Sequence, residues 1–232
     1  MWVGERGILM PKGGDSIAQF FHILLNLIED SIFLCIFGLI KDISFTMKEA
    51  INKALEVLRQ GGLILYPNDS LWAIGCDACH AEAVARLRQL KGLRLEKPWL
   101  ILLDNEVKVE RYVEALPPMA YDLWAMSDKA LTLIVDKPKS LAPCINSEAH
   151  LAVRLTKDAF SKRLLERFKR PILSTAALGE NEETLPLTFS EINPELKNAV
   201  DYVVDYAQDV RLPGLSALIA LPSDGTIKVI RA

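Results

Sequence analysis

Residues 63–98 read LILYPNDSLWAIGCDACHAEAVARLRQLKGLRLEKP, and this stretch decides the fold. The apolar run 63–66 predicts a strand that ends at Pro67, because proline cannot donate a hydrogen bond to a strand ladder. A second strand is expected over 71–75 and a helix over 82–91, with Val84, Leu87 and Leu90 facing inward. The order strand, polar turn, strand, helix is typical of a mixed α/β domain.

Two groups of polar residues flank this helix and form a candidate binding site. Asn68, Asp69 and Ser70 follow the first strand, and Lys91 and Arg94 follow the helix. Amides and hydroxyls that face cations predict a pocket for a polyanion such as a nucleotide. Each group also has a purely structural interpretation. The polar triplet could form an Asx-type turn, and the cations could complement the helix dipole.

Composition bounds the class of protein. The 232 residues are 50% hydrophobic and 25% charged, which suits one globular domain with a sizeable core. The first 46 residues hold three basic and five acidic residues, which leaves 24 basic against 25 acidic in the rest. Because the body is nearly neutral, nucleic-acid binding through bulk charge is excluded, and an anion site requires a local concentration of cations.

Four cysteines are too few for a disulfide scaffold at this length. Cys76 and Cys79 have the Cys-x-x-Cys spacing and precede His80, but a zinc site needs further ligands that the neighbouring sequence does not supply. We interpret both cysteines as small apolar residues at the end of a strand, with a metal or redox site as the alternative.

The first 46 residues differ in character from the rest. Residues 19–40 are strongly apolar, yet Glu29 and Asp30 interrupt them, and neither half reaches the ~20 residues of a spanning helix. A clean amphipathic helix begins at Met47, and its predicted apolar face consists of Ile51, Ala54, Leu55 and Leu58. We therefore predict an extension over 1–46 and a domain over 47–232, with Met47 as the true first residue. A membrane-associating extension is the alternative.

The remaining pattern alternates between strands and helices. Strands are expected over 99–103, 131–135, 151–155, 172–175, 202–205, 216–221 and 226–230, and helices after Met47, over 118–126 and after residue 158. Thr156 and Asp158 are the cap candidates of the last helix. Its predicted inward residues are Phe160, Leu164, Leu165 and Phe168. The prediction is an α/β (α+β) fold with one large twisted mixed sheet flanked by helices.

Over residues 47–231 the chain resembles the YrdC-like family of threonylcarbamoyl-AMP synthases. The family signature runs Thr-Asp-Thr, Lys-x-Arg, a strand arginine, Ser-x-Asn, a Ser-Thr pair and a last-strand arginine. Its counterparts here stand in the same order: Asn68-Asp69-Ser70, Lys91 with Arg94 shifted by one place, Arg154, Thr175 with Ala177, Ser216 and Arg231. The resemblance implies a concave ligand-binding face on a single YrdC-like domain.

The resemblance also implies roles for these residues. It assigns nucleotide binding to Lys91, Arg94, Thr132, Thr175 and Arg231, and threonine binding to Asn68, Ser70, Arg154 and Ser216. The implied reaction joins L-threonine, bicarbonate and ATP, with Mg²⁺, into threonylcarbamoyl-AMP for tRNA modification. It requires no covalent nucleophile and no metal-ligating side chains. The implied setting is the cytoplasm, beside downstream tRNA-modification proteins and without stable membrane association.

Two departures from the signature leave a second interpretation open. Leu93 stands at the in-register arginine, and Ala177 stands where the family has an asparagine. Each lost hydrogen bond to charge costs about 1.5–3 kcal/mol of binding. The alternative is therefore a catalytically inactive paralogue that binds nucleotide or double-stranded RNA. Arg154, flanked by apolar residues, is either a substrate clamp or a structural ion-pair partner, because burying it unpaired is costly.

Overall fold

The computed structural model describes residues 45–92, 98–179 and 184–232, and residues 47–232 form one compact unit. Residues 47–59 are helical. The strands are β1 (Ile64–Pro67), β2 (Trp72–Asp77), β3 (Leu100–Leu103), β4 (Leu131–Asp136), β5 (His150–Leu155), β6 (Ile172–Ala176), β7 (Tyr202–Val203), β8 (Ala217–Ala220) and β9 (Lys228–Arg231). The other helices are α2 (Ala81–Lys91), η2 (Glu106–Arg111), α3 (Met119–Met126), α4 (Pro143–Asn146), α5 (Ala159–Phe168), η3 (Phe189–Glu191) and α6 (Pro194–Ala199).

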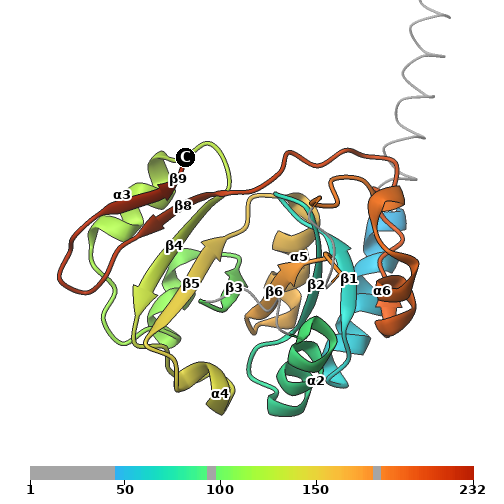
Figure 1. Ribbon diagram of the computed structural model, residues 1–232, viewed down its shortest axis with the longest axis horizontal. Helices are drawn as coiled ribbons and strands as arrows, with labels where there is room; N and C mark the ends of the chain where they lie inside the picture. The colour runs from blue at the N-terminus through green and yellow to red at the C-terminus, as the bar shows by residue number, and fades with distance from the viewer. Residues whose placement is uncertain (1–44, 93–97, 180–183) are drawn as a thin grey trace, which may run out of the picture. The chain divides into compact units, whose positions relative to one another are not determined.

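The strands form one mixed sheet with the order β7-β1-β2-β6-β3-β5-β4-β8-β9, which confirms the predicted fold class (Figure 1). Three pairs are parallel, namely β1 with β7, β3 with β5, and β4 with β8. The remaining pairs are antiparallel. Strands from distant parts of the sequence are thus neighbours, so the loops at their ends meet.

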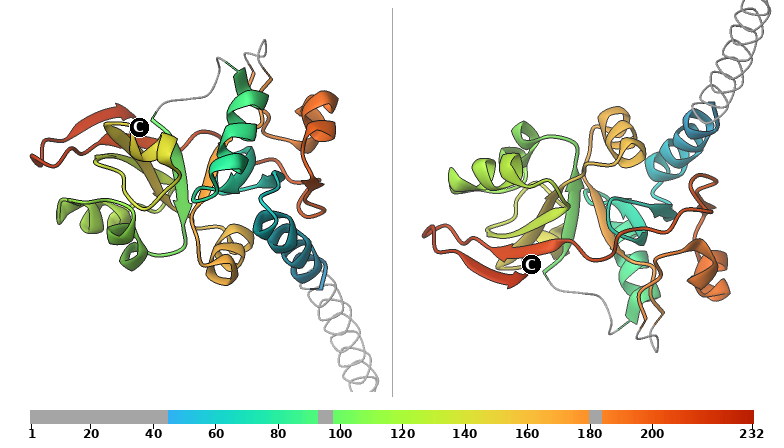
Figure 2. Two further views of the ribbon diagram at one scale, coloured as in Figure 1. Left: turned by 90° about the horizontal axis from the view of Figure 1, so that it is seen from below. Right: turned by 90° about the horizontal axis from the view of Figure 1, so that it is seen from above.

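Alternation along the strands divides the core between the two faces of the sheet. In β1, Leu65 belongs to a first core cluster with residues of α2 and α3, whereas Ile64 and Tyr66 belong to a second cluster with the helix 47–59 and α5. Figure 2 shows the helix 47–59 and α5 side by side on one side of the sheet. The sequence predicted the buried face of the first of these helices, and all four residues are buried: Ile51, Ala54, Leu55 and Leu58.

Helix α5 follows its sequence signals closely. Asp158 is the N-cap, and its carboxylate accepts a hydrogen bond from the backbone N–H of Ser161 at 2.7 Å. The other cap candidate, Thr156, instead donates its hydroxyl proton to Asp158 at 2.7 Å. The helix ends at Lys169 in the left-handed conformation (φ 63°). Its predicted inward residues are buried: Phe160, Leu164, Leu165 and Phe168.

One part of the sheet carries side chains that line a cavity instead of packing beneath a helix. In β4 and β5, Leu133 and Val153 point into the first cluster, so alternation places Thr132 and Arg154 on the other face. That face is covered by the second cluster over β1, β2 and β6. Thr132 and Arg154 both line the cavity. The fold therefore positions the site where helical cover ends.

Sequence reasoning missed four short helices, η2, α4, η3 and α6, each of at most six residues. Segments this short carry too few apolar positions to show a helical period. In the described part of the chain, no helix has both the length and the apolar character needed to cross a bilayer.

Candidate functional site

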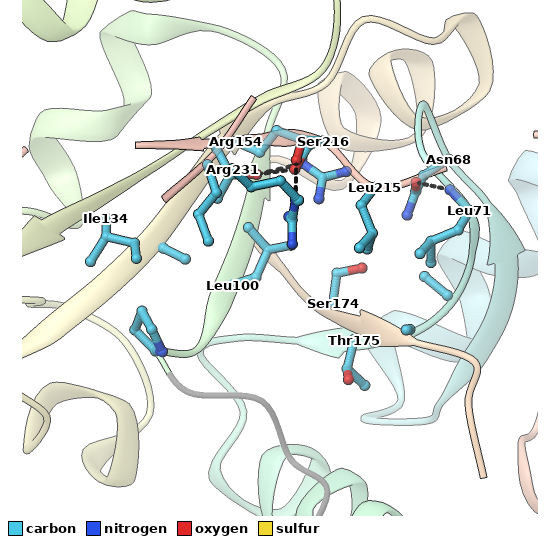
Figure 3. A pocket seen from close by; sticks show the side chains of 16 residues that line it. Asn68, Leu71, Leu100, Ile134, Arg154, Ser174, Thr175, Leu215, Ser216 and Arg231 are labelled. Atoms are coloured by element: carbon cyan, nitrogen blue, oxygen red, sulfur yellow. Dashed lines mark hydrogen bonds between the residues drawn. The ribbon is translucent and has the colours of Figure 1, made fainter. Parts of the chain in front are cut away.

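The open part of the sheet holds a cavity of about 120 Å³. Figure 3 shows Asn68, from the loop after β1, across this cavity from Ile134 of β4. The lining combines polar side chains with an apolar wall that includes Leu71 and Leu100. Six of the predicted site residues line it: Asn68, Thr132, Arg154, Thr175, Ser216 and Arg231. The structure thus brings together residues that are spread over 164 positions of the sequence, from 68 to 231.

Asn68 presents only one end of its amide to the cavity. Its Oδ1 accepts hydrogen bonds from the backbone N–H groups of Ser70 at 2.8 Å and Leu71 at 3.1 Å. This is the Asx turn that the sequence suggested as the structural interpretation. The turn fixes the orientation of the amide, and Nδ2 has no hydrogen-bond partner among the described residues. Asn68 therefore offers donors to a ligand, not an acceptor.

Arg154 is held on two sides by neighbouring side chains. Its Nε donates to Thr132 Oγ1 at 3.0 Å, and its Nη1 donates to Ser70 Oγ at 2.7 Å and to Asp69 Oδ1 at 3.0 Å. The ion pair answers one question that the sequence left open, because Arg154 has a structural partner. Arg154 also lines the cavity, so a contact with a ligand is open to it as well. Ser70 does not line this cavity, but its hydroxyl accepts a hydrogen bond from Arg154, which does.

Arg231 and Ser216 extend the polar network to the edge strand. Arg231 Nε donates to the carbonyl of Ser216 at 2.7 Å, and the Ser216 and Thr132 hydroxyls lie 2.8 Å apart (Figure 3). Because Thr132 also accepts from Arg154, one chain of hydrogen bonds connects the two arginines. Two guanidinium groups beside an apolar wall suit a ligand that is anionic at one end.

Strand β6 contributes two hydroxyls with different surroundings. Ser174, which sequence reasoning did not select, accepts a hydrogen bond from the Tyr66 hydroxyl at 2.8 Å and lines the cavity. Complete burial raises the pKa of Tyr66 well above its usual range, so this phenol is neutral and donates. Thr175 also lines the cavity, but its Oγ1 is buried and has no partner among the described residues.

Lys91 does not line the cavity. It is 4% exposed, and its Nζ donates to the carbonyls of Ala176 at 2.9 Å and Leu178 at 2.6 Å. The ammonium therefore contacts the segment that leaves β6 immediately after Thr175. The predicted nucleotide contact of Arg94 lies outside the described residues.

Two further sequence expectations concern Ala177 and the cysteines. Ala177 is fully buried in the first core cluster, and its N–H donates to the carbonyl of Trp72 at 2.8 Å. Cys76 lies in β2 and is buried, and burial raises its thiol pKa, as it also raises that of Cys79 to about 11. Among the described residues, no group of three or more His, Cys, Asp or Glu side chains could hold a metal ion.

A second cavity of about 450 Å³ adjoins the first, and Leu215 and Ser216 line both. Its lining includes Asp69 and two exposed lysines, Lys129 and Lys157. The Asp69–Arg154 ion pair therefore stands between the two cavities, with the aspartate lining one and the arginine lining the other.

Comparisons with protein families and with known proteins show what this chain is similar to. The family model Sua5_yciO_yrdC, described as Telomere recombination, matches residues 56–232. The threonylcarbamoyl-AMP synthase of Pseudoalteromonas translucida is 30% identical over 162 residues, covering 68% of this chain and 86% of that protein. The threonylcarbamoyl-AMP synthase of Hahella chejuensis is 31% identical over 180 residues, covering 75% of this chain and 90% of that protein.

Solved structures share the fold at lower identity. P. abyssi Sua5 in complex with L-threonine is 21% identical with a TM-score of 0.66, over 74% of this chain and 50% of that one. E. coli YciO is 24% identical with a TM-score of 0.66, over 78% of this chain and 87% of that one. This chain thus spans half of the Sua5 chain and most of YciO.

Proposed function

This chain belongs to the Sua5_yciO_yrdC family, and from that premise we propose that it is a threonylcarbamoyl-AMP synthase. In the proposed reaction the amine of L-threonine attacks the carbon of bicarbonate, and a carbamate forms with the loss of water. A carbamate oxygen then attacks the α-phosphorus of ATP, and pyrophosphate leaves. The product, threonylcarbamoyl-AMP, would pass to the proteins that modify tRNA.

The observation that carries this proposal is the cavity between Asn68, Arg154 and Arg231. It presents nitrogen donors at its polar side and apolar carbon at its wall. Such a cavity suits an amino acid with a free carboxylate, joined to a phosphate at the other end. The relatives that are about 30% identical carry the name of this activity.

In this proposal the side chains act by positioning and by neutralising charge. The Asn68 amide nitrogen and Arg154 Nη2 bind the threonine carboxylate, because neither nitrogen has a hydrogen-bond partner among the described residues. Arg231 uses its two η nitrogens for phosphate, since among the described residues only its Nε has a protein acceptor. Transfer to the α-phosphorus then needs only alignment and stabilisation of the leaving pyrophosphate.

Lys91 supports the site from behind in this proposal, whereas Thr175 lines the cavity itself. The Lys91 ammonium fixes the carbonyls of Ala176 and Leu178 and adds positive charge beneath the cavity. Mg²⁺ would arrive with ATP, coordinated by phosphate oxygens, and would neutralise the charge that develops on pyrophosphate. The described residues would contribute no cluster of ligands to it.

The proposal is tested by incubating the purified full chain with ATP, Mg²⁺, bicarbonate and L-threonine. We expect threonylcarbamoyl-AMP by mass spectrometry and an equal amount of pyrophosphate. Arg154→Lys keeps a charge beside Asp69 but removes the second donor nitrogen, so we expect kcat/KM to fall about 10- to 100-fold. The matched control is Arg86→Ala, which breaks an exposed 2.6 Å pair with Asp201 away from the cavity and should leave kcat/KM unchanged.

Each other result has a defined meaning. If the chain forms no product and binds no ATP in calorimetry, the proposal is refuted. ATP binding without turnover would favour the inactive paralogue, and retention of double-stranded RNA in a gel-shift assay would then identify its ligand. An equal fall in kcat/KM for the Arg154 and Arg86 variants would show that the cavity is not the active site.

A further inference from the structure

Asp69 and Arg154 form a buried ion pair that joins two distant parts of the sheet. Asp69 lies in the loop between β1 and β2, and Arg154 lies in β5. In the sheet order, β2, β6 and β3 stand between β1 and β5. Yet Arg154 Nη1 lies 3.0 Å from Asp69 Oδ1, and both side chains are only 7% exposed. The pair therefore reaches across the open face of the sheet, beside the cavity.

The carboxylate of Asp69 is itself fixed. Its second oxygen, Oδ2, accepts a hydrogen bond from the backbone N–H of Lys157 at 3.1 Å. Lys157 follows β5, the strand that carries Arg154, so Asp69 holds both the strand end and the guanidinium. An ionised carboxylate that accepts charge-assisted hydrogen bonds is a strong orienting group.

Arg154 keeps one end of its guanidinium available. Thr132 accepts the hydrogen bond from Nε, and Asp69 and Ser70 accept the hydrogen bonds from Nη1. Nη2 has no acceptor among the described residues, and it is not one of the buried polar atoms that lack a partner. A planar guanidinium that is fixed at Nε and Nη1 has its Nη2 direction fixed as well.

We infer that Asp69 is the positioning residue for the substrate carboxylate: it aims Arg154 Nη2 into the cavity without touching the substrate itself. The inference rests on the proposed function and deepens it, because it names what sets the geometry of the amino-acid subsite. Asp69 lines the neighbouring cavity and not the one that Arg154 lines, which is why its action must pass through the arginine.

The test variant is Asp69→Asn, for which the chain offers a closely matched control. Asp77 is another buried aspartate whose one oxygen accepts from Arg170 at 2.7 Å and whose other accepts from the backbone N–H of Cys79 at 2.9 Å. It lies at the far end of β2 and lines neither cavity. Asp77→Asn therefore removes the same charge and one carboxylate oxygen away from the site, from a pair whose arginine is 58% exposed where Arg154 is 7% exposed.

Steady-state kinetics of the full chain separates positioning from stability. We expect Asp69→Asn to raise KM for L-threonine about tenfold, with KM for ATP changed less than about twofold. Asp77→Asn should lower the melting temperature, because Asp77 is buried and paired, and should leave both KM values unchanged. In the Arg154→Lys background, Asp69→Asn should add less than about a twofold effect, because the two residues act as one unit.

Equal effects of the two aspartate variants on KM, or independent effects of Asp69 and Arg154 in the double variant, would overturn the inference. Absence of product from the unaltered chain would instead refute the proposed function. The positioning role of Asp69 can then still be tested by a second measurement. In an NMR spectrum of ¹⁵N-arginine-labelled protein, the Arg154 η nitrogens should give separate signals that Asp69→Asn collapses into one. Unchanged signals in that variant would overturn the positioning role without reference to activity.

Discussion

Replacing Ala177 by Asn restores the amide of the family motif, and the structure predicts that this change destabilises the protein instead of repairing the site. From sequence alone, Ala177→Asn would return a missing donor beside the hydroxyl of Thr175. In the structure, Ala177 is fully buried in the first core cluster, where Trp72 and Leu173 also pack. Its backbone N–H is already committed to the carbonyl of Trp72.

The magnitude follows from two contributions. Adding three heavy atoms to a filled core costs about 1–3 kcal/mol through displaced neighbours. Burying an amide without partners costs about 1–3 kcal/mol more. The free energy of unfolding should therefore fall by about 2–6 kcal/mol. For a chain of this size, a loss of about 3 kcal/mol corresponds to about 6–12 °C in melting temperature.

The assay is urea unfolding followed by tryptophan fluorescence, together with a thermal melt. Ala159→Asn is the control, because Ala159 is exposed at the start of α5 and its replacement should change stability by less than about 0.5 kcal/mol. An unchanged melting temperature with tighter ATP binding would refute this reasoning. That result would mean that the new amide reaches the cavity, as the motif implies.

Two further predictions concern the sheet. Gly75→Ala should lower the free energy of unfolding by about 1–3 kcal/mol in urea titrations, because a Cβ there would stand 2.7 Å from Tyr66 Cε1 and 2.8 Å from Ile172 Cγ2. An unchanged unfolding midpoint would show that these two side chains can move aside without cost. For Asp136, burial alone would raise the carboxyl pKa, but hydrogen bonds from Ser223 and His150 outweigh it and hold the pKa below the ordinary 3.8. The folded state thus favours the ionised form, so the stability that this carboxylate contributes is present above pH 3.8 and is lost as the pH falls through the folded pKa. Asp136→Asn should be less stable than the unaltered chain at pH 6 and equal to it in strong acid, and a constant difference across that range would contradict the assignment.

The sequence by itself determined the parts of this protein that depend on local periodicity. Apolar side chains that recur at helical spacing predicted the buried faces of the helices at 47–59 and 159–168. Asp158, as a cap residue, predicted the start of α5. The sequence also placed strands close to where they are found, with 131–135 predicted for β4 (Leu131–Asp136) and 151–155 for β5 (His150–Leu155). The order of the motif residues was enough to predict the family that the comparisons then showed.

Only the tertiary structure decided which side chains of the candidate site meet. Sequence alone did not show that the Lys91 ammonium binds the carbonyls of Ala176 and Leu178, or that Ala177 fills space in the core. The Asp69–Arg154 pair joins residues 85 positions apart across three intervening strands. Such contacts depend on the strand order and the curvature of the whole sheet. Both arise from packing between segments that are far apart in the sequence, and the local pattern of one segment does not show which other segment it will pack against.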